Sequence, residues 1–141
     1  MIKAIVEKLM KKHKTNCPFT LAKKMNINIL YENLGTTMGY FNKDCRFRFI
    51  HINQSLNEEE NTFTCAHELG HAIVHPNVNT PFLKRHTLFS VDKIEREANT
   101  FAVELLLPDN LLQENAECSV FNIGKAVGIP DKLIKLKSQI K

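Results

Sequence analysis

Two histidines four residues apart constrain this chain more than any other feature. They lie in the run His67-Glu68-Leu69-Gly70-His71. On a helix, residues spaced by four project from the same face, so both imidazoles can reach one metal ion. This H-E-x-x-H pattern is typical of a zinc-dependent peptidase in which the glutamate is the general base. The alternative interpretation is an amphipathic helix with two hydrogen-bonded histidines.

The segment around the histidines, residues 61–75, has the periodicity of a buried helix. Its apolar side chains recur at steps of three and four residues: Phe63, Ala66, Leu69 and Ile73. Asn57 precedes three glutamates and can cap this helix, and Pro76 ends it. A glycine inside a helix costs about 1 kcal/mol relative to alanine. We therefore interpret Gly70 as a position where another element packs closely on the backbone.

A catalytic zinc usually has three protein ligands, so a third residue is required. Its best source is residues 91–108, a second predicted helix with an apolar stripe. Glu95 lies beside that stripe with Asn99 one turn later, whereas Glu97 points toward solvent. His75 continues the series of His67 and His71. However, three histidines along a straight helix span about 12 Å, which favours Glu95 as the third ligand.

The two segments together resemble a known family. The H-E-x-x-H run precedes Glu95-Arg96-Glu97-Ala98-Asn99-Thr100-Phe101-Ala102 and Leu105-Leu106-Leu107-Pro108. This combination resembles the ImmA/IrrE family of metallo-endopeptidases, small gluzincin-type proteins of bacteria, phages and integrative elements. The resemblance covers roughly residues 18–115. Leu107 stands where the family commonly has methionine, which changes packing and not chemistry.

The resemblance implies a site and a function. One Zn²⁺ would be bound by His67, His71 and Glu95, Glu68 would be the catalytic base, and Asn99 would fix the tautomer of a ligating histidine. The family's known role implies site-specific cleavage of a helix-turn-helix repressor, which derepresses a phage, a mobile element or a stress response. Two alternatives stay open. One is a non-proteolytic regulator, an antirepressor or DNA-associated protein that keeps the fold. The other is a peptidase with broader substrates.

Length and composition favour one domain, because the chain has 141 residues of which 43% are hydrophobic. We expect an α+β fold, a compact minimal zincin-like domain whose small antiparallel sheet packs on the histidine-bearing helix. Its predicted parts are a helical lead-in, the small sheet, the metal-binding helices and a C-terminal helical pair: residues 1–25, 26–56, 57–108 and 109–141.

Alternating apolar residues predict three strands, at 27–31, 36–42 and 45–52. A short turn at 42–44 would join the last two strands into a hairpin. In gluzincins, which the chain resembles, an edge strand borders the cleft and pairs with the backbone of the substrate. Segment 45–52 is the candidate for that strand.

Helices are predicted at residues 2–13 and 18–25, and two short helices at 121–140. The last two are faintly similar to a helix-turn-helix, but we favour a pair that packs against the core. Loop 76–90 carries His86, which with His75 and Tyr40 is a candidate to stabilise an oxyanion or contact substrate. The alternative for each is a polar side chain without a catalytic role.

Cysteines and charge limit the environment and the partners. The four cysteines are scattered, no signal peptide is recognisable, and no apolar run could span a membrane. We therefore expect a cytoplasmic protein with free thiols and no membrane partner. Residues 1–25 hold seven Lys and one Glu, and residues 119–141 hold five Lys and one Asp. Because no arginine–aromatic pattern accompanies this charge, we expect solvated helix faces and no direct nucleic-acid binding.

Overall fold

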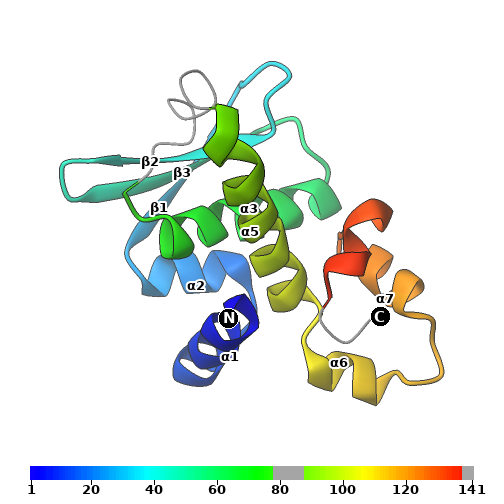
Figure 1. The fold of residues 1–141 in the computed structure, drawn as a ribbon. Helices are drawn as coiled ribbons and strands as arrows, with labels where there is room; N and C mark the ends of the chain where they lie inside the picture. The colour runs from blue at the N-terminus through cyan, green and yellow to red at the C-terminus, as the bar shows by residue number, and fades with distance from the viewer. Residues whose placement is uncertain (78–87, 138–141) are drawn as a thin grey trace.

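The histidine-bearing helix, α3 (Glu58–Val74), packs against a three-stranded sheet and against a long second helix, α5 (Leu88–Leu106) (Figure 1). The computed structural model describes residues 1–77 and 88–137, with side chains over 1–77 and 92–137. The other helices are α1 (Ile2–His13), α2 (Pro18–Lys24), α6 (Asp109–Glu114), α7 (Val120–Ala126) and the 3-10 helix η1 (Asp131–Leu136). Among the described helices, none combines the length and the apolar character that a membrane span requires.

Helix α3 begins where the sequence predicts. The Asn57 side chain accepts a hydrogen bond from the backbone N–H of Glu60 at 2.8 Å, and the Glu60 carboxylate accepts one from the backbone N–H of Asn57 at 3.2 Å. This reciprocal pair satisfies two backbone donors that the first turn of a helix leaves without partners. The cap therefore fixes the register of the helix about four turns before its second histidine.

The sheet consists of β1 (Ile27–Glu32), β2 (Gly39–Asp44) and β3 (Phe47–Asn53), in the order β1-β3-β2. The predicted α+β class is confirmed, but the sheet is mixed and not wholly antiparallel. Strand directions alternate along the chain, and β3 lies between the first two strands. Consequently β3 is antiparallel to β2 and parallel to β1.

This strand order corrects the expectation for segment 45–52. That segment forms β3, the central strand, and both of its edges are paired with neighbouring strands. The prediction that this segment is the edge strand beside a cleft is therefore wrong. The edge strand that contacts the histidine-bearing helix α3 is β2. The hairpin turn also lies later than predicted, at Cys45 and Arg46, where Cys45 adopts a positive φ of 55°.

Helices α3 and α5 approach closely at Gly70, as predicted from the glycine. A β-carbon at Gly70 would lie 3.0 Å from the β-carbon of Phe101 on α5. Phe101 itself is fully buried, and so is Cys65, which belongs to the core. The contact between these helices sets how near side chains on α5 come to the two histidines.

The C-terminal segment closes the core, as the packing interpretation predicts. Helix η1 contacts both α5 and α7, and Ile129 and Ile134 are buried. A buried ion pair adds to this contact, because Lys137 Nζ lies 2.7 Å from Glu104 Oε1 and 2.8 Å from Asp109 Oδ1. Asp109 also pairs with Lys3 at 2.8 Å. The pairs thereby connect the end of η1 to α5, α6 and α1.

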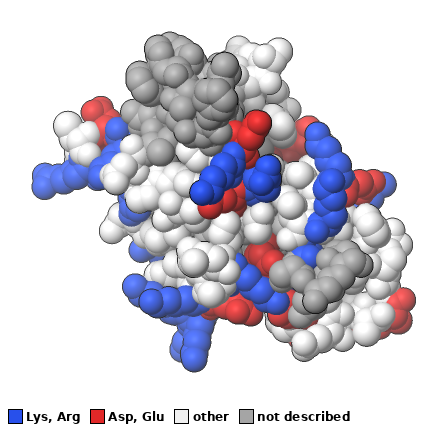
Figure 2. Space-filling model, in the orientation of Figure 1, with Lys and Arg blue, Asp and Glu red and all other residues white. Residues whose placement is uncertain are grey.

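Four of the seven lysines of the N-terminal segment lie in the last turn of a helix. Lys11 and Lys12 are in the last turn of α1, and Lys23 and Lys24 are in the last turn of α2. Cations stabilise this end of a helix because the helix dipole places partial negative charge there. On the face drawn in Figure 2, lysine and arginine side chains are interspersed with acidic and uncharged ones. A local structural role therefore accounts for these lysines.

Candidate metal centre

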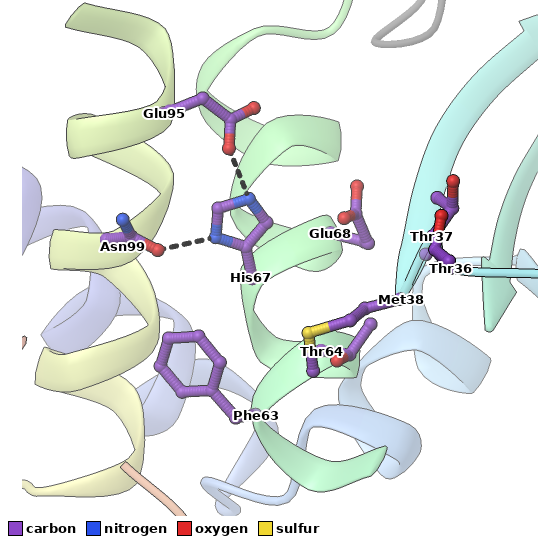
Figure 3. A pocket seen from close by; sticks show the side chains of 10 residues that line it. Thr36, Thr37, Met38, Phe63, Thr64, His67, Glu68, Glu95 and Asn99 are labelled. Atoms are coloured by element: carbon purple, nitrogen blue, oxygen red, sulfur yellow. Dashed lines mark hydrogen bonds and ion pairs between the residues drawn. The ribbon is translucent and has the colours of Figure 1, made fainter. Parts of the chain in front are cut away.

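Three side chains from two helices converge on one point. His67 and His71 project from α3, Glu95 projects from α5, and one ligand atom of each lies within 4.8 Å of the others. His67 Nε2 is 2.9 Å from Glu95 Oε2 (Figure 3). His71 Nε2 is 3.1 Å from Glu95 Oε1. The close approach of α5 at Gly70 brings the carboxylate within this distance of both imidazoles. These three residues could hold a metal ion.

The electrostatic environment keeps the cluster's carboxylate ionised. Burial acts to raise the pKa of Glu95, but hydrogen bonds with His67 and His71 lower it well below its usual range. For His67, burial acts to lower the pKa, and the hydrogen bond to Glu95 with the charges of Glu68 and Glu95 raises it. His71 is fully buried, and its pKa is lowered. The cluster therefore offers an anionic oxygen ligand beside two imidazoles.

Asn99 orients the first histidine. Its side-chain oxygen lies 2.8 Å from His67 Nδ1 (Figure 3). An amide oxygen only accepts, so this contact places the proton of His67 on Nδ1. With a metal ion bound, the lone pair of His67 would be on Nε2, which faces the point of convergence; without the ion, Nε2 carries a second proton, which it donates to Glu95. Asn99 lies one turn beyond Glu95 on α5, so the same helix supplies both contacts.

A cavity of about 430 Å³ opens beside the cluster. Glu68 lines it together with His67 and Glu95, and its side chain lies between His67 and the segment before β2 (Figure 3). The other lining residues come from that segment, from α3 and from α5: Thr36, Thr37, Met38, Gly39, Phe63, Thr64 and Asn99. Glu68 is only 4% exposed, so little of its side chain is open to bulk water.

Gly39 lets the edge strand approach α3. A β-carbon at this position would lie 2.6 Å from the backbone oxygen of His51 and 2.7 Å from Thr64 Cγ2. The same β-carbon would be 3.7 Å from Glu68 Cγ. Any side chain at Gly39 would therefore push the strand away from α3 and change the cavity beside Glu68.

The three candidates for stabilising an oxyanion or contacting substrate, which are Tyr40, His75 and His86, have different positions. Tyr40 does not line the cavity and stacks on the ring of His51, with centroids 4.1 Å apart. His75 contacts His71, with 3.1 Å between their Nδ1 atoms, and also the carboxylate of Glu97. Glu97 was predicted to point toward solvent, and the structure gives it His75 as a partner. His86 lies outside the described residues.

Sequence reasoning missed most of the cavity wall. Phe63 and Thr64 lie one turn before His67 and Glu68, so helical spacing could have indicated them. Residues 36–38 gave no such signal. They line the cavity because β3 lies between β1 and β2, an arrangement of the whole sheet that no local pattern encodes.

Comparison with known sequences decides the family. The sequence model of the IrrE N-terminal-like domain, a peptidase family, matches residues 22–120. This chain belongs to the ImmA/IrrE family. The match spans β1 to the start of α7, and so includes both helices of the cluster. The resemblance inferred from the paired motifs is confirmed, and membership implies a metallopeptidase-type site.

Two relatives support the assignment to the ImmA/IrrE family. The chain is 51% identical over 140 residues to uncharacterized immunity region protein 2 of Bacillus phage phi105, which covers 97% of this chain and 89% of the relative. It is 36% identical over 115 residues to metallopeptidase ImmA of Bacillus subtilis (strain 168), which covers 80% of this chain and 67% of that protein.

A solved structure of a Mycobacterium tuberculosis transcriptional regulator has a similar fold, with a TM-score of 0.62. The two sequences are only 14% identical, and the match covers 96% of this chain but 45% of the regulator. At this identity the similarity concerns the fold alone. It shows that the α+β arrangement of this ImmA/IrrE member also occurs within a longer chain.

Proposed function

We propose that this chain is a zinc-dependent endopeptidase that cleaves a helix-turn-helix transcriptional repressor at a specific site. The observation that carries the proposal is the convergence of His67, His71 and Glu95 beside a cavity that Glu68 also lines. Two imidazole nitrogens and a carboxylate oxygen are a donor set that catalytic zinc uses. The three residues therefore fit the ion that the family implies, and one Zn²⁺ would be held by them.

Bound zinc would act as a Lewis acid that polarises the scissile carbonyl and makes water more acidic. Glu68 would accept the proton of the attacking water and later deliver it to the leaving amine. Its position in the cavity, beside His67 but outside the ligand cluster, supports this role. Asn99 would hold His67 in the tautomer that presents Nε2.

The substrate would enter as an extended segment beside β2. That strand is paired on one edge only, and residues 36–39, which lead into it, form a wall of the cavity. Backbone pairing with an edge strand gives affinity, while pockets for alternate side chains give specificity. A cavity of about 430 Å³ between Met38, Phe63 and Thr64 could receive one such side chain.

The regulatory role is inferred from the relatives. One relative is named for a phage immunity region and another is named metallopeptidase ImmA. We infer that the substrate is a repressor encoded close to this chain, and that its cleavage derepresses a phage or mobile element. The setting would be the cytoplasm, where such a repressor binds its operator.

Incubating the purified chain with the repressor encoded beside it tests the proposal. We expect two discrete fragments in the presence of zinc and intact repressor when a chelator is added, because cleavage requires the metal. Mass spectrometry of the fragments would locate the cut bond. Intact repressor with zinc present, together with derepression by stoichiometric binding of the chain, would instead support a non-proteolytic regulator.

A further inference from the structure

His71 is supported by a chain of hydrogen bonds that the metal cluster does not include. Its Nε2 faces Glu95, and its Nδ1 lies 3.1 Å from Nδ1 of His75. His75 Nε2 in turn lies 2.9 Å from Glu97 Oε1. The side chains of His71 and His75 are only 1% and 8% exposed, so bulk water cannot readily replace these partners.

The direction of each hydrogen bond in this chain follows from the carboxylate of Glu97 at its end. A carboxylate accepts from the ring N–H of a histidine, so Glu97 places a proton of His75 on Nε2. The other ring nitrogen of His75, Nδ1, can then accept the Nδ1–H of His71. With a metal ion at the point of convergence, His71 would offer the ion the lone pair on Nε2, the atom that faces Glu95.

The two histidines of the cluster are thus supported differently. His67 donates directly to Asn99, a neutral amide on α5. His71 donates to His75, and the chain ends on the carboxylate of Glu97, also on α5. A carboxylate at the end of such a chain raises the basicity of the imidazole at its start, which strengthens a metal bond.

We propose that His75 and Glu97 are positioning residues, which hold His71 in its metal-binding tautomer through the hydrogen-bond chain His71–His75–Glu97. This inference rests on the proposed function, because it presumes that His71 binds zinc. It assigns to His75 a role other than contact with substrate or oxyanion. It also explains why Glu97, which is outside the ligand cluster, pairs with a histidine at the end of α3.

Zinc affinity tests the hydrogen-bond chain without any substrate. In competition with a chromophoric zinc chelator, we expect Glu97→Ala to raise the Kd for Zn²⁺ about tenfold and His75→Phe to raise it about 10- to 100-fold, as for other residues that support metal ligands. Asp92→Ala is the matched control, because it removes an exposed carboxylate from the same helix. Its Kd should equal that of the wild type.

Two comparisons separate a positioning role from a general structural effect. Glu97→Gln keeps an accepting oxygen and should restore most of the affinity that Glu97→Ala loses. Because Glu97 acts through His75, the double variant should bind zinc no more weakly than His75→Phe alone. Additive losses, a Gln variant as weak as the Ala variant, or equal Kd values for Glu97→Ala and Asp92→Ala would each overturn the inference.

The wild-type result distinguishes this inference from the proposed function. A wild-type chain without affinity for Zn²⁺ would overturn the metal site itself. A wild type that binds zinc, with variants at His75 and Glu97 that bind it equally well, would overturn only the hydrogen-bond chain. Circular dichroism of each variant before zinc addition would verify that the fold is retained, which matters most for His75 at the end of α3.

Discussion

Replacing Glu68 with glutamine should leave zinc bound and lower the cleavage rate by at least about 10²–10⁴-fold, the range that general acid–base catalysis contributes. Glutamine has nearly the same size and shape, so the cavity wall should be preserved. It cannot accept a proton from water at neutral pH, so the attacking nucleophile would not form. Glu68 lines the cavity but is not one of the three clustered ligands, which is why metal binding should persist.

The comparison requires cleavage rates and zinc content from the same preparations. Glu59→Gln is the matched control, because it makes the same chemical change at an exposed position of α3. That control should cleave at the wild-type rate. Wild-type cleavage by Glu68→Gln would show that another group is the base. Loss of zinc from this variant would show that Glu68 belongs to the ligand set.

Replacing Lys137 with methionine should lower the free energy of unfolding by about 3–5 kcal/mol, the cost of removing one partner from a buried ion pair. Lys137 and Glu104 have side chains that are 1% and 2% exposed, and their charged atoms are 2.7 Å apart. Methionine fills similar space but leaves the Glu104 carboxylate buried without its cation. Urea unfolding would measure the change.

Lys135→Met is the control for Lys137→Met, because Lys135 is exposed on the 3-10 helix that Lys137 directly follows. Its stability should remain within about 0.5 kcal/mol of the wild type. Equal stabilities for the two variants would contradict a stabilising role for the buried pair. The variant Lys137→Met should also release the C-terminal segment from α5, which protease sensitivity would report.

Acid should weaken the ion pairs of Asp109 with Lys137 and Lys3. Burial acts to raise the pKa of Asp109, but hydrogen bonds from Lys137 and Lys3 outweigh it and lower the pKa. A carboxyl group with a lowered pKa stabilises the fold above its unfolded-state pKa, and this contribution is lost as the pH falls through the lowered value. The contribution of Asp109 is therefore fully present at neutral pH.

Local patterns predicted the helices well because the causes of a helix are local. The cap at Asn57, the periodicity of α3 and α5 and the glycine at position 70 each act within a few residues. Glu95 was predicted as the third metal ligand on equally local grounds, because it lies beside the apolar stripe of α5. The close packing of α3 and α5 at Gly70 sets how these two helices lie relative to each other.

Features that depend on the whole sheet or on distant segments were not predictable in this way. Because β3 lies between β1 and β2, it is the central strand and not the expected edge strand. The alternation of apolar residues along one strand does not encode the order of the strands in the sheet. Lys137 is one of many lysines in a basic segment, and only the folded chain brings it to Glu104. His75 and Glu97 are likewise 22 positions apart in sequence.

The most direct test of the central claim is the zinc content of purified variants by elemental analysis. We expect one zinc per wild-type chain and loss of that zinc in His67→Ala and in Glu95→Ala, because each removes one of three ligands. Glu97→Ala should retain zinc when the ion is supplied in excess. Loss of zinc in Glu97→Ala with retention in Glu95→Ala would contradict the proposed metal site.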